Sequence, residues 1–234
     1  MTIPASSVIR RVTDTLQDTG VRWPVHELVR WLNESQRAIS GARPDAINVT
    51  ANVTLVAGPR QDLDSMGLSP APLKLIAVQR NTAVTSNKAA VTLVQKHLMD
   101  AHKPSWYNAT PDVSTAHYMF DVRDPKTFYV YPPATPSAQL EINYAAYPVD
   151  IVEPANGATY VDVMGNLSVP DIYDGVVVDL VLYRAYLKDS ESAANQQRAD
   201  SHRAAAGAAL GVELTATLAV QPQIKPSSNN SRQA

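Results

Sequence analysis

The chain has 234 residues, and its 20 Lys and Arg residues nearly balance its 22 Asp and Glu residues, which leaves a formal net charge of -2. This balance gives no global argument for a nucleic acid or an acidic membrane as the partner. The absence of cysteine excludes a disulfide scaffold, a cysteine-ligated zinc site and a thiol nucleophile.

The N-terminal sequence MTIPASSVIRRV lacks the apolar core of a signal peptide. No apolar run in the chain approaches the roughly 20 residues that a membrane-spanning helix needs. We therefore expect a protein that is made in a cytosol and has no membrane partner.

Two amphipathic helices are predicted in the first part of the chain. Ser6 or Ser7 can cap the first helix, which should end near Gly20. The second helix should begin at Pro24 and stop at Gly41. The apolar positions at helical spacing are Val8, Val12 and Leu16 in the first helix and Val25, Leu28, Trp31, Leu32 and Ile39 in the second.

After Ile47 the hydrophobic pattern changes to alternation, which is typical of half-buried strands. Strands are predicted at INVTANVTLVAG, LKLIAVQRNT and QLEINYAAYPVDI, with KAAVTLVQ as a weaker candidate. The sequence TAHYMFDVRDPKTFYVYPPA predicts a β-hairpin, and GPRQDLD predicts a turn. A short helical piece is expected around His97 to His102, and a loop at residues 153–168 leads back to helices.

Two consecutive helices are predicted from Pro170 to Gly211. The first has a broad apolar face that includes Tyr173, and Ser190 can cap the second. Gly211 is predicted to end the second helix, because glycine adopts the left-handed conformation without a Cβ penalty. The inward positions of the second helix are predicted to be small: Ala194, Ser201, Ala204, Ala205 and Ala208.

Together these elements predict an α+β fold. The N-terminal helices (residues 1–43) and the C-terminal helices (residues 169–211) should form one helical bundle, with an antiparallel β domain inserted at residues 44–168. Residues 212–234 are predicted to be an extended or disordered tail, because Ser, Asn, Gln and Pro bury little apolar surface. Its apolar residues are candidates for ordering on a partner, for instance as an added strand: Val212, Leu214, Leu218, Val220 and Ile224.

The sequence contains no Gly-rich phosphate loop, HExxH or GxSxG motif. The strongest apparent metal cluster is His97, Asp100 and His102, but its two histidines are five residues apart, whereas neighbours on a helix are three or four apart. The acids on predicted strands and turns are ordinary solvated carboxylates: Asp121, Asp124 and Glu141. We therefore expect no catalytic residue, no metal and no cofactor.

The first helical region carries six Arg and four acids, which is a mild basic excess. These arginines could face DNA, or they could pair with acids of the C-terminal helices. We favour pairing, with Asp171, Asp174 and Asp179 as the partners.

One ordered set of segments resembles a known family: RWPVHELVRWLNESQRAI, ARPDA, AGPRQDL, DVRDPKTFYVYPP and LYRAYLKDSESAANQQRADSH. Over about residues 5–211 the chain is similar to the head-to-tail adaptor (connector) proteins of short-tailed phages. The resemblance implies a non-enzymatic virion protein of the neck, assembled in the host cytoplasm.

The resemblance also implies partners. The expected assembly is a dodecameric ring that joins the phage portal protein to the tail nozzle or tail tube and lets genomic DNA pass without sequence recognition. The C-terminal tail is expected to reach the portal. The residues expected to contribute to subunit packing are Trp31, Tyr173, Ala204 and Ala208.

Two other functions stay open from the sequence. One is a tail-associated module that binds a glycan or receptor through the β insertion, and the other, less favoured, is a tail hydrolase. A glycan binder should expose its aromatic side chains, whereas an adaptor should bury most of them. The relevant residues are Trp106, Tyr107, Tyr118, Tyr129 and Tyr131.

Overall fold

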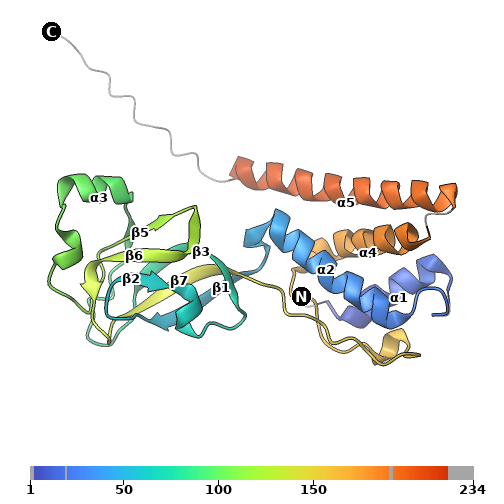
Figure 1. Cartoon of the computed structure of the whole chain (residues 1–234), viewed down its shortest axis with the longest axis horizontal. Helices are drawn as coiled ribbons and strands as arrows, with labels where there is room; N and C mark the ends of the chain where they lie inside the picture. Colours follow the sequence, from blue (N-terminus) through green and yellow to red (C-terminus); the bar gives the residue numbers. More distant parts are fainter. Residues whose placement is uncertain (1–2, 19, 190–191, 221–234) are drawn as a thin grey trace, which may run out of the picture.

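The computed structural model describes residues 3–18, 20–189 and 192–220, with side chains described as far as Gly211. Helices from both ends of the chain gather at one end of the molecule, and the strands inserted between them lie at the other (Figure 1). The predicted α+β fold is therefore confirmed. The helices of the bundle are α1 (Ala5–Leu16), α2 (Val25–Ala42), α4 (Asp174–Lys188) and α5 (Ala193–Val220).

Helix α4 is the centre of the bundle. It contacts α1, α2 and α5, so it is covered on several sides. Its apolar residues accordingly do not form a single stripe. The buried residues are Val176, Val177, Val178, Val181, Leu182, Ala185 and Tyr186. A short 3-10 turn, Asp171–Tyr173, precedes α4, so the α-helix begins four residues after Pro170.

The predicted serine cap of α1 is wrong. The helix begins at Ala5, before Ser6, and its N-cap residue is Pro4, which offers no side-chain acceptor. Instead, the Ala5 N–H donates to the carbonyl oxygen of Gly165 at 3.0 Å, far away in the sequence. A tertiary contact thus satisfies a helix N-terminal donor that a cap would otherwise satisfy.

The described strands form two sheets. The first has the order β1 (Asn48–Thr54), β7 (Gln139–Ala146), β3 (Pro72–Asn81) and is antiparallel. The second has the order β2 (Gly58–Asp62), β6 (Asp124–Ala134), β5 (His117–Asp121), β4 (Thr92–Leu93), with only the β4–β5 pair parallel. Buried side chains of both sheets belong to one hydrophobic cluster: Leu75, Val78, Phe128, Val130, Leu140 and Ile142.

The segment GPRQD, predicted as a turn, is strand β2 at the edge of the second sheet. Its proline is tolerated there because an edge strand need not donate every hydrogen bond. The Gln61 side chain is 1% exposed. Its amide accepts from Val56 N–H and donates to the carbonyl oxygens of Val56 and Gly58. A side chain thus closes the corner between β1 and β2.

The predicted hairpin (β5–β6) and the short helix α3 (Lys96–His102) are confirmed.

Residues 147–173, which connect β7 to α4, form what we call the return segment. The segment is fixed to α2 by Asn33, which is 6% exposed. The Asn33 amide donates to the Ile151 carbonyl and accepts from the Ile151 N–H, both at 2.8 Å. Farther along, Ser168 N–H donates to the Gln36 side chain at 2.7 Å. The returning chain is therefore held along α2 at two points.

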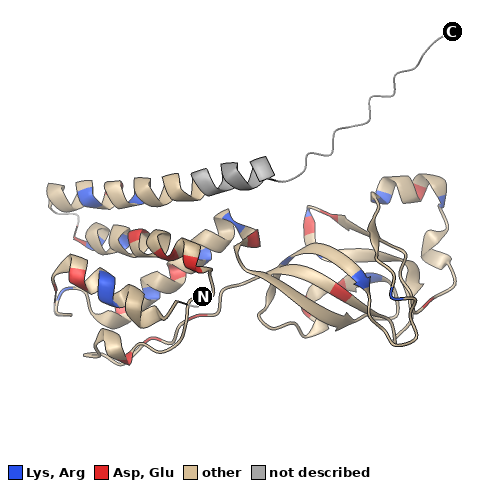
Figure 2. Cartoon of the chain, turned by 180° about the vertical axis from the view of Figure 1, so that it is seen from behind, with Lys and Arg blue, Asp and Glu red and all other residues tan. Residues whose placement is uncertain are grey.

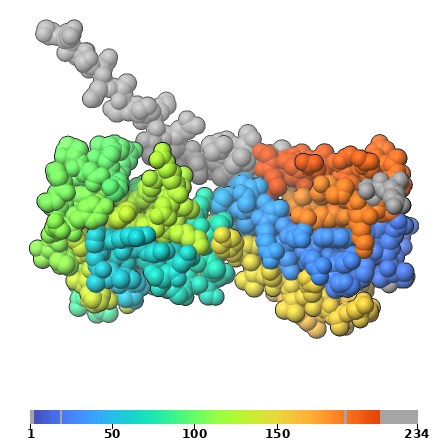
Figure 3. All heavy atoms as spheres, viewed as in Figure 1, coloured from blue at the N-terminus to red at the C-terminus, as the bar shows by residue number. Residues whose placement is uncertain are grey.

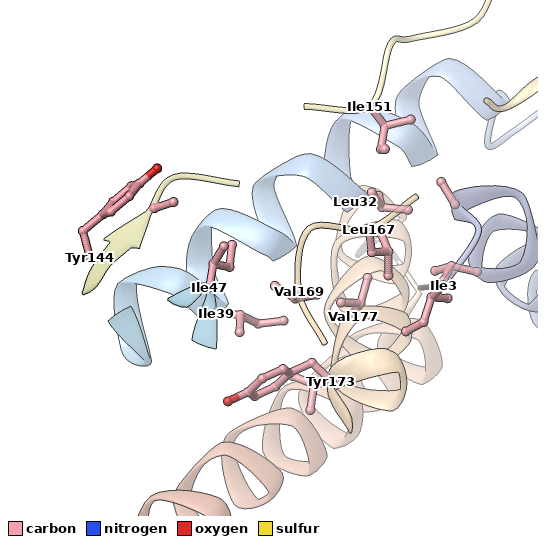
Figure 4. Close-up of a cluster of buried hydrophobic side chains, with 14 of the residues drawn as sticks. Ile3, Leu32, Ile39, Ile47, Tyr144, Ile151, Leu167, Val169, Tyr173 and Val177 are labelled. Atoms are coloured by element: carbon pink, nitrogen blue, oxygen red, sulfur yellow. The ribbon is translucent and has the colours of Figure 1, made fainter. Parts of the chain in front are cut away.

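Apolar side chains of the return segment complete the core of the bundle. Leu167 and Val169 lie in one buried cluster with Leu32 and Ile39 of α2 and Val177 of α4 (Figure 4). The loop is therefore part of the core of the bundle, and the bundle depends on it.

Gly211 does not end α5, because the helix continues to Val220. A glycine inside a helix costs only about 1 kcal/mol relative to alanine, and good helix formers such as Ala209 and Leu214 lie on either side. Of the residues predicted to be an extended tail, Val212 to Val220 thus have a helical backbone rather than that of a strand. Ile224 lies outside the described residues.

We expect Asn33→Leu to lower the free energy of unfolding by about 2–4 kcal/mol, because the buried N–H and carbonyl of Ile151 would both lose their partner. Urea unfolding measures the change. The matched control is Asn108→Leu, since Asn108 is exposed and such a substitution should change stability by less than about 0.5 kcal/mol. Equal effects of the two substitutions would contradict the role assigned to Asn33.

Candidate assembly surface

Helix α5 lies on α4 through a narrow set of positions. Ala199 is fully buried and Ala206 is 1% exposed, and on the same side of the helix Asn195, His202 and Leu210 are half-buried. The five small residues predicted to face inward are all exposed: Ala194, Ser201, Ala204, Ala205 and Ala208. The prediction is wrong because α5 carries small residues on more than one face, so their spacing alone does not select the buried one.

Polar contacts set the register of α5 on α4. His202 Nδ1 lies 2.9 Å from Asp179 Oδ1, and the His202 ring stacks on Tyr186 with centroids 5.8 Å apart. Asn195 donates to the Asp189 carboxylate at 2.6 Å. These contacts hold the first half of α5 along α4.

The opposite side of α5 is exposed and carries no charge. We call this surface the outer α5 face. In Figure 2 the α5 ribbon is tan from its second arginine to the last residue whose side chain is described. A surface helix ordinarily presents charged or polar residues to water, whereas this face presents small or uncharged residues. Its residues recur at spacings of three and four: Gln197, Ser201, Ala204, Ala208 and Gly211.

The residues predicted for subunit packing divide into two pairs. Ala204 and Ala208 belong to the outer α5 face and are available for contact. Tyr173 is only 3% exposed, and Trp31 packs against the hydrophobic core of its own chain. Tyr173 is therefore a packing residue within the subunit.

Arginines of the first two helices pair with acids of the same chain. Arg11 forms an ion pair with Asp174, as favoured from the sequence, whereas Asp179 contacts His202 instead. Arg30 donates to both oxygens of Glu153, at 3.1 and 2.9 Å. This contact lowers the pKa of the Glu153 carboxyl below its usual value. Arg37 of α2 pairs with Asp150, and Arg22, in the connection between α1 and α2, pairs with Asp189. The helices thus do not present a continuous free basic surface.

An aromatic cluster packs beneath α3. Trp106 is fully buried, stacks on Tyr107 with centroids 3.7 Å apart, and donates its indole N–H to Asp100 at 2.8 Å. This hydrogen bond, together with one from Lys96, lowers the pKa of the Asp100 carboxyl. Asp100 therefore has a structural role. Across the described residues, no group of three or more His, Asp or Glu is placed to hold a metal ion.

The aromatic side chains considered for glycan binding are mostly withdrawn from solvent. Trp106 and Tyr118 are buried, at 0% and 5% exposure. Tyr129 and Tyr131 are half-buried, and only Tyr107 is exposed, at 41%. This arrangement favours a packing role over an exposed aromatic platform.

A cavity that the sequence did not predict lies where the α1–α2 connection meets the return segment. Its volume is about 310 Å³. The one acid in its wall, Asp18, accepts hydrogen bonds from the backbone N–H groups of Gly20, Arg22 and Trp23, at 3.0–3.2 Å. This carboxylate stabilises the turn and does not point to catalysis. The lining residues are Thr13, Asp18, Gly20, Trp23, Pro24, Val25, Gly157, Ala158, Thr159 and Tyr160.

Comparison with known protein families gives a match along most of the chain. Residues 3–227 match the family model described as SU10 adaptor protein, which covers nearly the whole chain. No curated protein matches the chain. Within the described residues, no helix has the length and apolar character needed to cross a membrane.

We expect Ala206→Glu to detach α5 from α4, because a carboxylate cannot be accommodated at a position that is 1% exposed. Amide hydrogen exchange of residues 193–211 should accelerate by at least about tenfold. Ala205→Glu, at the adjacent exposed position, is the matched control and should leave exchange unchanged. The same acceleration in both variants would contradict the observed orientation of α5.

Proposed function

The chain belongs to the SU10 adaptor protein family, and from this premise we propose that it forms the ring that joins the portal of a phage to its tail. As a phage adaptor it is a structural protein of the virion neck. The ring is expected to be a dodecamer and to continue the DNA channel from the portal to the tail nozzle or tail tube.

The observation that best supports a ring is the exposed, uncharged outer α5 face. A ring is built from lateral contacts between copies, and such contacts bury surface that is apolar and depleted in charge. The stretch from Ala204 to Val212 contains no charged residue, and its described side chains are mostly exposed. This surface supports a contact between subunits.

Passage of DNA without sequence recognition agrees with the charges. The net charge of -2 and the ion pairs of the α1 and α2 arginines leave no concentrated basic surface for tight phosphate binding on the described part of the helical bundle. A channel wall of this kind would let the genome slide.

We assign portal binding to the C-terminal region of the chain. Its apolar residues follow the last described side chain, and the C-terminal part of α5 extends beyond the start of α4 (Figure 1). The candidate contact residues are Val212, Leu214, Leu218, Val220 and Ile224.

The alternative functions have less support. Glu141 forms an ion pair with Arg80 at 2.9 Å, and Asp121 accepts a hydrogen bond from the Arg123 N–H of the β5–β6 turn at 2.9 Å. Both acids are therefore engaged in the β part of the fold, which does not favour a hydrolase. The burial of Trp106 and Tyr118 likewise weighs against a glycan-binding module.

Electron microscopy of the purified protein mixed with phage portal tests the proposal directly. We expect rings of the chain stacked on the portal ring. A chain that stays monomeric and never joins the portal would refute the proposed function.

We expect a chain truncated after Gly211 to fold normally but to bind the portal at least about tenfold more weakly, since the interface would lose large apolar side chains. Co-sedimentation with portal measures binding, and thermal unfolding measures the fold. The control lacks only residues 228–234, which are polar except for Ala234 and lie beyond the family match. This control should bind normally, and undiminished binding of the longer truncation would remove the tail from the interface.

A further inference from the structure

A ring needs a second surface to meet the outer α5 face. Contacts that repeat head to tail around a ring join two different, complementary surfaces of each subunit. A surface that meets the outer α5 face should therefore be apolar.

The return segment exposes an unusual amount of apolar surface. Its large apolar side chains include several that are more than half exposed. A concentration of exposed apolar residues in one segment marks an interaction surface. They are Val149 (58%), Val152 (83%), Val161 (62%), Met164 (74%) and Ile172 (66%).

The acids of the return segment are mostly engaged within the subunit. They are Asp150, Glu153, Asp162 and Asp171. Asp150 and Glu153 pair with Arg37 and Arg30 of α2, and Asp162 accepts hydrogen bonds from Thr159. On α5, Arg198 and Arg203 lie over tyrosine rings of α4, at 5.7 and 6.0 Å from the ring centroids. Neither guanidinium has an acidic partner among the described residues. The exposed Asp200 lies between these two arginines on the same helix, so this margin of α5 carries both signs of charge.

The two surfaces lie on opposite sides of the helical bundle. Helix α5 runs along one side and the return segment along the other, with α2 and α4 between them (Figure 1). The space-filling view shows the same separation (Figure 3). In a large ring the two contact surfaces of a subunit lie nearly opposite one another, because each subunit is rotated only slightly from the next.

We propose that the outer α5 face of one subunit packs against the return segment of the next copy of this chain. The alanines let the neighbouring segment approach closely, and its valines and Met164 fill the contact. This inference rests on the proposed ring and names the two surfaces that build it.

Thiol cross-linking tests which surfaces meet, and the cysteine-free chain makes every introduced thiol unique. The double variant Ala204→Cys with Val152→Cys should give a ladder of covalent oligomers with a short bismaleimide. Each single variant should stay monomeric on denaturing gels. Dimers from Ala204→Cys alone would show that α5 meets α5 and would overturn the inference, as would a double variant that forms rings without cross-links.

A mixing experiment tests the same arrangement without cross-links. Ala204→Glu with Ala208→Glu blocks one surface, and Val152→Glu with Met164→Glu blocks the other. Each variant alone should associate at least about tenfold more weakly, because a carboxylate is costly to bury in an apolar contact. An equimolar mixture should form heterodimers, since one unaltered pair of surfaces remains. A mixture that stays monomeric, with both variants folded, would overturn the inference.

The control separates this inference from the proposed function. Val84→Glu, at a residue 91% exposed and far from both surfaces in the sequence, should form rings as the unmodified chain does. If the unmodified chain forms no ring with portal, the proposed function fails. If it forms rings and both blocked variants do so equally well, only the assignment of surfaces fails.

Discussion

The fold depends on the attachment of the return segment to α2. The chain leaves the helical part after α2, builds both sheets and comes back at residues 147–173. The reciprocal hydrogen bonds between Asn33 and the Ile151 backbone fix that return in a place closed to water, where an unpaired backbone group would be costly. Because Leu167 and Val169 of the same segment pack in the core, α4 can dock only where this attachment places it.

The position of α4 in turn decides what α5 can do. Helix α4 is covered by α1 and α2 and is apolar around much of its circumference, so it needs a third helix as cover. Helix α5 supplies it with Ala199 and Ala206, which let the two helices approach closely. Small residues on the far side of α5 are then left at the surface.

Charged side chains of the helical part mostly pair within the subunit, whereas the proposed contact surface on α5 carries no charge. Most arginines of α1 and α2 pair with acids that the return segment and α4 bring to them, and such exposed pairs contribute little stability individually. These pairs do neutralise most of the positive charge of α1 and α2. What remains is an uncharged helix face on one side of the bundle and a segment with exposed valines on the other.

The sequence by itself determined the class of most elements and the closure of the two chain ends around the strands, because helical and alternating periods are local properties. It also carried the family likeness. Tertiary structure alone decided that Gly58–Asp62 pairs as an edge strand, since Gln61 acts across a corner that no local pattern reveals. Tertiary structure also decided that Ala199 and Ala206 face α4, whereas Ala204 and Ala208 face away from it. Periodicity places small residues on the faces of a helix, but only the neighbouring helix decides which face is buried.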